Sequence, residues 1–209
     1  MSHSKSSLTC PVDLDTKRLQ EEIASMYARV ATDPNGEFHF HRGPDYAAEL
    51  LGYDRAELAK LPAEVTASFA GVANPHSIRE VGPGETVLDI GSGAGMDLLI
   101  AAQRIGPLGR AIGIERSPEM TAKCRAGAAE AALSNVEVLN ADLHELPLKD
   151  ASVHVVISNG VLNLAHDKLT AFREIARVLE PGGHLQLGDI AVELPLSEGI
   201  RKNFDLWAA

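Results

Sequence analysis

The stretch Val87-Leu-Asp-Ile-Gly-Ser-Gly-Ala-Gly95 decides the fold. A short apolar run leads into a turn with three glycines, and the chain then continues with the helical pattern of residues 96–104. Glycines at such a turn let the backbone approach a ligand where a side chain would collide with it. We therefore predict a strand, a ligand-binding turn and a helix, which together form the first unit of an α/β domain.

The same alternation of short apolar runs and longer helical segments continues from residue 85 onward. It predicts a mostly parallel, doubly wound sheet with helices on both faces and a ligand crevice beyond the carboxyl ends of its strands. We expect Pro181-Gly-Gly183 to act as a stop signal after the last helix. The expected strands are residues 86–90, 111–114, 136–139, 153–158 and 184–187, and the expected helices are residues 96–104, 118–132 and 167–179.

The N-terminal part of the chain has a different pattern. Residues 14–31 carry apolar side chains at helical spacing, which predicts an amphipathic helix. Two short helices are expected at residues 45–51 and 54–61, with Asp54 as the N-cap of the second. Gly82-Pro-Gly84 then marks a boundary. We therefore divide the chain into a helical cap region, residues 1–79, which covers the crevice and selects the substrate, and a ligand-binding domain, residues 80–209.

Composition and charge narrow the function classes. The 209 residues are 45% hydrophobic and 23% charged, which excludes a disordered chain. The net charge of −10 argues against a nucleic-acid partner, because affinity for phosphate backbones depends on Lys and Arg. No apolar run approaches the ~20 residues needed to cross a bilayer, and no signal peptide is recognisable. The two cysteines, Cys10 and Cys124, are therefore expected to be reduced thiols in the cytoplasm.

Acidic residues at successive strand ends indicate the ligand. Asp89 enters the glycine turn, where it would repel a pyrophosphate and attract a cation, and Met96 replaces the third glycine of the dinucleotide pattern. Both features favour S-adenosylmethionine, which carries an ammonium and a sulfonium group. Glu115 ends the second strand, where it can accept hydrogen bonds from both ribose hydroxyls of an adenosine. Asp142 follows the third strand, at the position that faces an adenine.

Several motifs in this order resemble those of class I methyltransferases dependent on S-adenosylmethionine. They are Asp89-Ile-Gly-Ser-Gly-Ala-Gly95, Glu115-Arg-Ser-Pro-Glu-Met120, Asp142, Leu146-Pro147, Val156-Ile-Ser-Asn159 and Val178-Leu-Glu-Pro-Gly-Gly183, within residues 80–190. Asn74-Pro75 and Ile157-Ser-Asn-Gly-Val-Leu-Asn-Leu-Ala-His-Asp-Lys168 resemble the arsenite methyltransferase branch. The resemblance implies the Rossmann-like class I methyltransferase fold and S-adenosylmethionine as the cofactor.

The resemblance also implies the role of particular residues. The glycine turn would line the methionine part of the cofactor, Glu115 would hold the ribose, Met120 would pack near the adenine, and Asp142 would bind its amine. The backbone of Asn159 would face the ammonium group. The complete expected cofactor-binding set is Asp89, Gly91, Ser92, Gly93, Gly95, Glu115, Arg116, Met120, Asp142, Leu143 and Asn159.

The chain departs from the arsenite methyltransferase pattern at its cysteines. That branch holds trivalent arsenic on cysteine thiolates, because arsenic is thiophilic. This chain has Val72 before the Asn-Pro pair and Gly160 after Ser158-Asn159, where the branch has cysteines, and a third cysteine would lie beyond Ala209. We therefore expect the cofactor site to be present and efficient arsenite methylation to be absent.

No catalytic residue is assigned, because a reactive acceptor needs little beyond positioning and sometimes a base. His144 is the best candidate for a general base, and Asp167 is expected to be a helix N-cap. Phe38-His39-Phe40-His41 resembles half of a metal site, but it lacks a nearby acidic or cysteine partner, so no metal is expected.

Two function classes stay open at this point. One is an active methyltransferase that acts on a small-molecule acceptor, and the other is a cofactor-binding protein that is catalytically silent. A dehydrogenase is a third, disfavoured by Asp89 and Met96. The 19 residues after the fifth strand cannot supply the two further strands of the complete class I fold. The fifth strand would then be an exposed edge, which predicts a homo-oligomer or a fragment of a longer protein.

Overall fold

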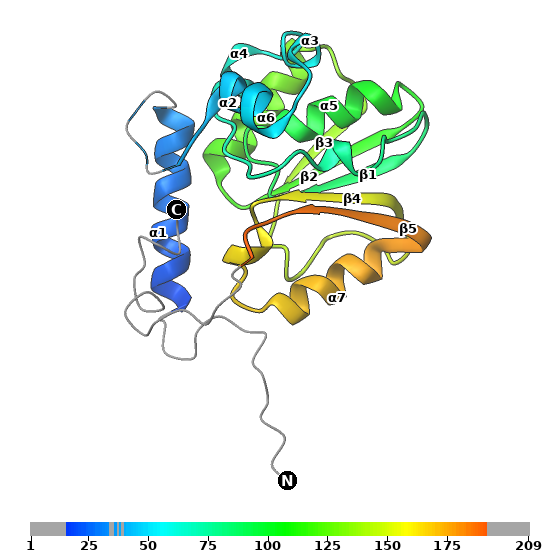
Figure 1. Ribbon diagram of the computed structural model, residues 1–209. Coiled ribbons are helices and arrows are strands. Elements are labelled where there is room, and N and C mark those ends of the chain that lie inside the picture. Colours follow the sequence, from blue (N-terminus) through cyan, green and yellow to red (C-terminus); the bar gives the residue numbers. More distant parts are fainter. Residues whose placement is uncertain (1–15, 34–35, 37, 39, 192–209) are drawn as a thin grey trace.

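The computed structural model describes residues 16–33, 36, 38 and 40–191, and its centre is a five-stranded parallel sheet (Figure 1). The strand order is β3-β2-β1-β4-β5, and every neighbouring pair is parallel. This order reverses direction next to β1, which carries the glycine turn, so the predicted doubly wound sheet is confirmed. The strands are β1 (Thr86–Ile90), β2 (Arg110–Glu115), β3 (Val136–Asn140), β4 (Val153–Asn159) and β5 (Leu179–Gly188).

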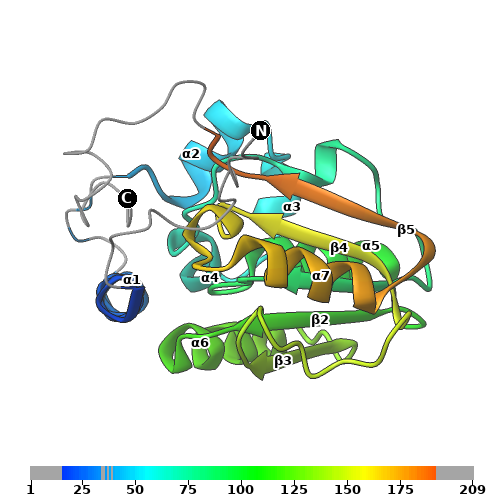
Figure 2. The ribbon, with the colours of Figure 1, turned by 90° about the horizontal axis from the view of Figure 1, so that it is seen from below.

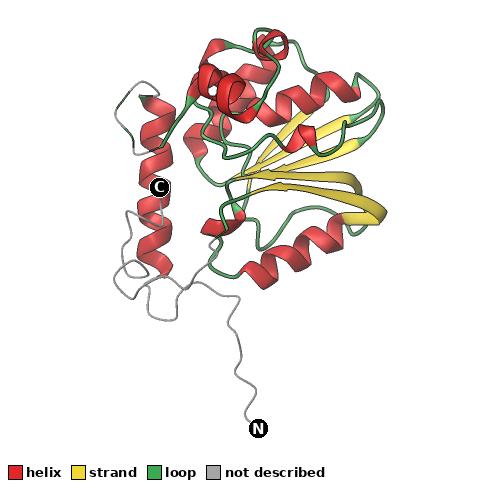
Figure 3. Ribbon diagram, viewed as in Figure 1, coloured by secondary structure: helices red, strands yellow, loops and turns green. Residues whose placement is uncertain are grey.

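Helices cover both faces of the sheet (Figure 3). The α-helices are α1 (Thr16–Thr32), α2 (Gly43–Leu51), α3 (Arg55–Leu58), α4 (Ala63–Ala67), α5 (Met96–Ile105), α6 (Pro118–Glu130) and α7 (Lys168–Val178), and the 3-10 turns are η1 (Pro75–Ser77) and η2 (Leu162–Leu164). Helix α7 lies on one face, and α5 and α6 lie on the other (Figure 1). The two faces are buried because alternate strand residues point to opposite sides: Leu88 packs toward α7, whereas Val87 packs toward α5.

The N-terminal elements cover the carboxyl ends of the strands. Helix α1 stands across these ends, and Figure 2 shows it along its own axis beside the sheet. Val30 of α1 packs against Ala94 and Met120 of the sheet domain. Helices α2, α3 and α4 form a buried cluster with α5 and α6, in which Val65 and Leu99 are nearly inaccessible to solvent. The cap and the sheet domain therefore share a hydrophobic core.

The structure differs from the sequence prediction at the start of β5, and it contains one helix, α4, that was not predicted. Strand β5 begins at Leu179 and runs through Pro181-Gly-Gly183, which was expected to separate helix from strand. The register changes from Val153↔Leu179 to Val155↔His184, so residues 180–183 form a bulge opposite a single residue of β4. Helix α4 was not predicted, because five residues are too few to show a helical period.

Asp54 and Asp167 cap their helices as predicted. Asp54 accepts a hydrogen bond from the backbone N–H of Ala56, and Asp167 accepts one from that of Thr170. In the described part of the chain β5 is an outer strand of the sheet. The expectations for Cys10 and for the segment after β5 concern residues outside the described ranges.

The contact between α4 and α6 generates a stability prediction. A Cβ atom on Gly127 would lie 2.3 Å from Cγ2 of Val65, a stiff side chain that is 1% exposed. Alanine at position 127 favours the helix by about 1 kcal/mol, but overpacking costs about 1–3 kcal/mol, so we expect a net loss of stability of about 1 kcal/mol for Gly127→Ala. Urea unfolding measures this difference.

The matched variant is Gly127→Ala combined with Val65→Ala. Removing the obstructing side chain makes room for the new methyl group, so the double variant should be more stable than the sum of the two single losses implies. Strict additivity of the two changes, or a Gly127→Ala protein more stable than the parent, contradicts the packing explanation.

Candidate functional site

A pocket lies at the carboxyl ends of β1 to β4, where the strand order reverses. Each of these strands contributes an acidic or polar residue at or just beyond its end: Asp89, Glu115, Asp142 and Asn159. The cap supplies the opposite wall, through Ile23, Ala24 and Tyr27 of α1 and through residues 68–71. Ten of the eleven expected cofactor-binding residues line this pocket: Asp89, Gly91, Ser92, Gly93, Glu115, Arg116, Met120, Asp142, Leu143 and Asn159.

Gly95 is the exception. Its backbone has a positive φ of 100°, and a Cβ atom there would lie 2.4 Å from the sulfur of Cys124 on α6. Gly95 is therefore needed for the turn and for the packing of α6. Gly93 also has a positive φ, of 53°, but a Cβ atom there would have no atom within 4 Å. The bare backbone of Gly93 faces the open pocket, as expected for a loop that contacts a ligand.

Glu115 is held in place by backbone amides. Its Oε2 accepts a hydrogen bond from Gly93 N at 2.9 Å, and its Oε1 accepts one from Ser117 N at 2.7 Å. Burial raises the pKa of Glu115, and hydrogen bonds from the backbone amides of Ser117, Gly93 and Arg116 partly oppose that rise. A carboxylate can accept about four hydrogen bonds, so these amides do not exhaust its capacity. The carboxylate can therefore accept hydrogen bonds from a ligand with two adjacent hydroxyl groups.

Asp89 is a buried carboxyl group with one oxygen left without a hydrogen-bond partner among the described residues. The residue is 2% exposed, and its Oδ2 has no hydrogen-bond partner among the described residues. Burial raises the pKa of Asp89, and the charges of Asp97 and Glu115 raise it further. A buried carboxylate in this condition needs a donor or a cation to offset its desolvation. Asp89 thus gives the pocket a preference for a positively charged group.

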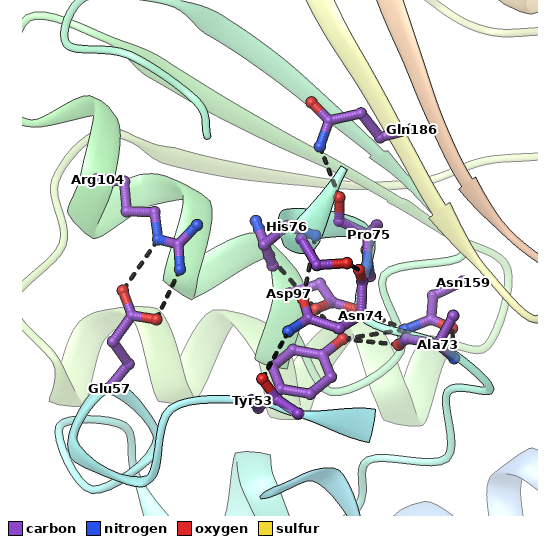
Figure 4. A network of polar contacts seen from close by, with 12 residues as sticks. Tyr53, Glu57, Ala73, Asn74, Pro75, His76, Asp97, Arg104, Asn159 and Gln186 are labelled. Atoms are coloured by element: carbon purple, nitrogen blue, oxygen red, sulfur yellow. Dashed lines mark hydrogen bonds and ion pairs between the residues drawn. The ribbon is translucent and has the colours of Figure 1, made fainter. Parts of the chain in front are cut away.

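Asp97 belongs to a polar network that joins the cap to the sheet domain (Figure 4). Its Oδ1 accepts a hydrogen bond from the Tyr53 hydroxyl at 2.7 Å, and its Oδ2 accepts one from Asn159 Nδ2 at 3.0 Å. Nε2 of His76 lies 3.3 Å from Asp97 Oδ1. The pKa of Tyr53 is raised well above its ordinary value, by burial first and then by Asp97.

The side chain of Asn159 fixes the segment that follows α4. Its Oδ1 accepts hydrogen bonds from the backbone amides of Val72 and Ala73, at 2.8 and 3.1 Å, and its Nδ2 donates to the carbonyl of Ala73 at 2.7 Å. These bonds, together with those to Asp97 and Tyr53, occupy the whole amide group. Asn159 can therefore offer a ligand its backbone only.

At the other end of the pocket Asp142 interacts with two neighbours. Its Oδ1 accepts a hydrogen bond from the backbone N–H of His144 and lies 2.5 Å from His144 Nδ1, and its Oδ2 lies 3.9 Å from Nε of Arg116. The largest effect on the pKa of Asp142 is burial, which raises it, but the bonds to His144 leave a net lowering. Asp142 is therefore ionised at neutral pH, in an arrangement that also fixes the His144 ring.

Sequence reasoning missed the polar network around Asp97. Asp97 lies in an apolar helix and Tyr53 lies 44 residues earlier, so only the fold brings the two together. His41, in the expected half metal site, stacks on Tyr46 with the ring centroids 5.3 Å apart. Among the described residues no group of three His, Cys, Asp or Glu side chains is placed to hold a metal ion. No helix in the described ranges is long and apolar enough to span a membrane.

Comparison with known proteins shows the family to which the chain is related. The family model described as "Methyltransferase domain" matches residues 82–209. An arsenite methyltransferase of Halobacterium salinarum is 36% identical over 215 aligned residues, which cover 97% of this chain and 55% of the relative. A demethylmenaquinone methyltransferase of Listeria monocytogenes is 34% identical over 131 residues, which cover 62% of this chain and 54% of the relative. The chain thus spans about half the length of these relatives.

A solved structure gives the same result. The crystal structure of an arsenic(III) S-adenosylmethionine methyltransferase from Chlamydomonas reinhardtii superimposes with a TM-score of 0.66 at 33% sequence identity, covering 74% of this chain and 56% of that protein. The fold of that structure and the matched family domain agree. The chain belongs to the class I S-adenosylmethionine-dependent methyltransferases.

Proposed function

We propose that the protein transfers a methyl group from S-adenosylmethionine to a small-molecule acceptor that is not held on cysteine thiolates. The observation that carries the cofactor part is the buried Asp89 carboxylate, whose Oδ2 lacks a partner among the described residues. S-adenosylmethionine has an ammonium and a sulfonium group to offset that charge, and a ribose whose two hydroxyls match the lone pairs of Glu115. A pyrophosphate would bring further negative charge to the same place.

Each part of the pocket has a role in this proposal. Glu115 accepts the ribose hydroxyls, Asp89 and the backbone of Asn159 face the ammonium group, and the exposed backbone of Gly93 lies against the ligand. When bound, S-adenosylmethionine supplies a methyl group on a sulfonium, which a well-placed nucleophile attacks without further activation. The cap excludes water from this end of the pocket and orients the acceptor, which are the main contributions that methyl transfer needs from a protein.

The acceptor part of the proposal depends on two neighbouring positions. A Cβ atom on Gly160 would lie 3.5 Å from Cγ1 of Val72, so the two sites at which the arsenite branch has cysteines are adjacent in space. Here they present an isopropyl group and a hydrogen atom, neither of which binds a soft metalloid ion. The thiol of Cys124 is buried in α6, and burial raises its pKa to about 12, so it is no substitute. An organic acceptor fits these surroundings better.

A cofactor-binding protein without catalytic activity is the alternative, favoured by the same loss of both cysteines. Methyl transfer from labelled S-adenosylmethionine, tested across a panel of small phenolic, thiol and carbon-acid acceptors, separates the two. Turnover that is lost with the cofactor site establishes the enzyme. Tight cofactor binding with no turnover on any acceptor supports the alternative.

The ribose assignment leads to a binding prediction. We expect Glu115→Ala to weaken binding of S-adenosylhomocysteine by about 1.5–3 kcal/mol, because the carboxylate would accept two hydroxyl hydrogen bonds. Isothermal calorimetry measures the affinity, and thermal unfolding confirms that the variant is folded. Glu130→Ala removes an equal charge from the exposed end of α6 and should bind normally. Equal affinity in Glu115→Ala and Glu130→Ala would contradict the assignment.

The glycine turn gives a second binding prediction. Gly93→Val places an isopropyl group in the open pocket and strains the turn, where φ is 53°, so it should abolish binding of S-adenosylhomocysteine while the core, which the new side chain does not contact, stays intact. The fold is checked by circular dichroism and the affinity by calorimetry. Normal binding by a folded valine variant would mean that residue 93 does not contact the ligand.

Asp89 leads to a prediction in which stability and binding change in opposite directions. Because burial raises its pKa, the ionised carboxylate destabilises the folded state at pH values above its ordinary pKa of 3.8. Asp89→Asn should therefore stabilise the ligand-free protein at pH 7 by about 1 kcal/mol, an advantage that disappears as the pH falls toward that value. The same variant should bind S-adenosylhomocysteine roughly tenfold more weakly. An Asp89→Asn protein that is less stable at pH 7 and binds normally would refute the role of this charge.

The acceptor proposal predicts the outcome with arsenite. Neither Val72 nor Gly160 supplies a thiolate, so the protein with S-adenosylmethionine and glutathione should form no methylated arsenic above background. Chromatography of the arsenic species provides the measurement. Rapid methylation that is lost in Cys124→Ala or Cys10→Ala would show that the cysteines outside these two positions form the acceptor site.

A further inference from the structure

Two histidines, His144 and His166, form part of the wall of the cofactor pocket. His144 follows β3 and His166 lies between η2 and α7, and both line the pocket. Their ring centroids are 4.0 Å apart, at an interplanar angle of 44°. The contact joins two loops that belong to strands on opposite sides of β1. The two imidazole rings thus form a wall of the pocket together, with one ring from each loop.

The position of this wall identifies the part of the ligand that it meets, and this step rests on the proposed function. If Glu115 at the end of β2 holds the ribose, the base extends toward the next strand outward, β3. Met120, 1% exposed, and Leu143 line the pocket there. The carboxylate of Asp142 lies at the end of the same part of the pocket. His144 and His166 therefore lie at the edge of the pocket where the exocyclic amine of the base would be.

The wall is held in one arrangement by its neighbours. Oδ1 of Asp142 accepts from the backbone of His144 and contacts its Nδ1, which fixes the ring. Nε2 of His144 is inaccessible to solvent and lacks a hydrogen-bond partner among the described residues, so the ring edge is packed rather than hydrated. His166 precedes Asp167, whose side chain caps α7. Neighbouring Leu143 and Ala165 belong to the same hydrophobic cluster. Side chains that are packed in this way do not move aside easily for a larger ligand.

We propose that His144 and His166 determine cofactor specificity at the base, by limiting the space beside its exocyclic amine to an unsubstituted NH₂ group. Asp142 has a positioning role in this wall, because one of its oxygens is already committed to His144. Removing one imidazole leaves room for a substituent on that amine, while the groups that hold the ribose and the amino acid are untouched.

The test uses S-adenosylhomocysteine and its N6-benzyl derivative with the full chain. Calorimetry should show that the parent binds the benzyl derivative at least roughly tenfold more weakly than S-adenosylhomocysteine. His166→Ala should bring the two affinities within about threefold of each other, through tighter binding of the benzyl derivative. His144→Ala should act in the same direction and serves as the second variant if one of the two fails to fold. His184→Ala, at an exposed position on β5, is the matched control and should behave like the parent.

A gain of binding distinguishes a specificity wall from a merely structural contact, because a destabilised pocket would bind both ligands more weakly. The inference is overturned if the parent already accepts the benzyl derivative, or if both alanine variants bind S-adenosylhomocysteine normally and still reject the derivative. A parent that binds neither ligand would instead overturn the proposed cofactor site, and this inference with it.

Discussion

The site is organised around the carboxyl groups of Asp89 and Glu115, which are buried at the ends of β1 and β2. Asp89 and Asp97 are 2% and 6% exposed, and Glu115 lies beside them. Burying a carboxylate costs several kcal/mol unless a partner offsets it, so the fold accepts a local cost at this edge. The benefit appears when a ligand that carries positive charge and hydroxyl groups occupies the pocket, because a site shielded from water strengthens each electrostatic contact.

The cap is part of this arrangement and shares a core with the sheet. A single amide side chain, that of Asn159, holds the backbone of Val72 and Ala73 and also contacts Asp97 and Tyr53 (Figure 4). Asn159, at the end of β4, therefore positions the backbone of Val72 and Ala73 beside Gly160.

Local patterns were sufficient to predict much of the fold, and most of the residues that they assign to a cofactor line one pocket. The strand–glycine–helix unit, the caps at Asp54 and Asp167, and the acidic groups at three strand ends depend on residues close together in the sequence, which a pattern can show. The β5 bulge at residues 180–183 depends on pairing with β4. A Pro-Gly-Gly sequence considered alone predicts a turn instead. Gly95 belongs to the glycine pattern that predicts a ligand contact, but a side chain at this position would collide with Cys124 of α6. The His144–His166 contact and the Tyr53–Asp97 bond join residues that only the folded chain brings together.

The most direct test of the central claim is a pair of calorimetric titrations of the full chain at neutral pH, one with S-adenosylhomocysteine and one with NAD. Both ligands carry an adenosine that suits Glu115, but only NAD carries a pyrophosphate that Asp89 would repel. The account predicts saturable one-to-one binding of S-adenosylhomocysteine and no binding of NAD. Binding of NAD at equal or higher affinity would contradict the assignment of the buried carboxylates to a cationic methyl donor.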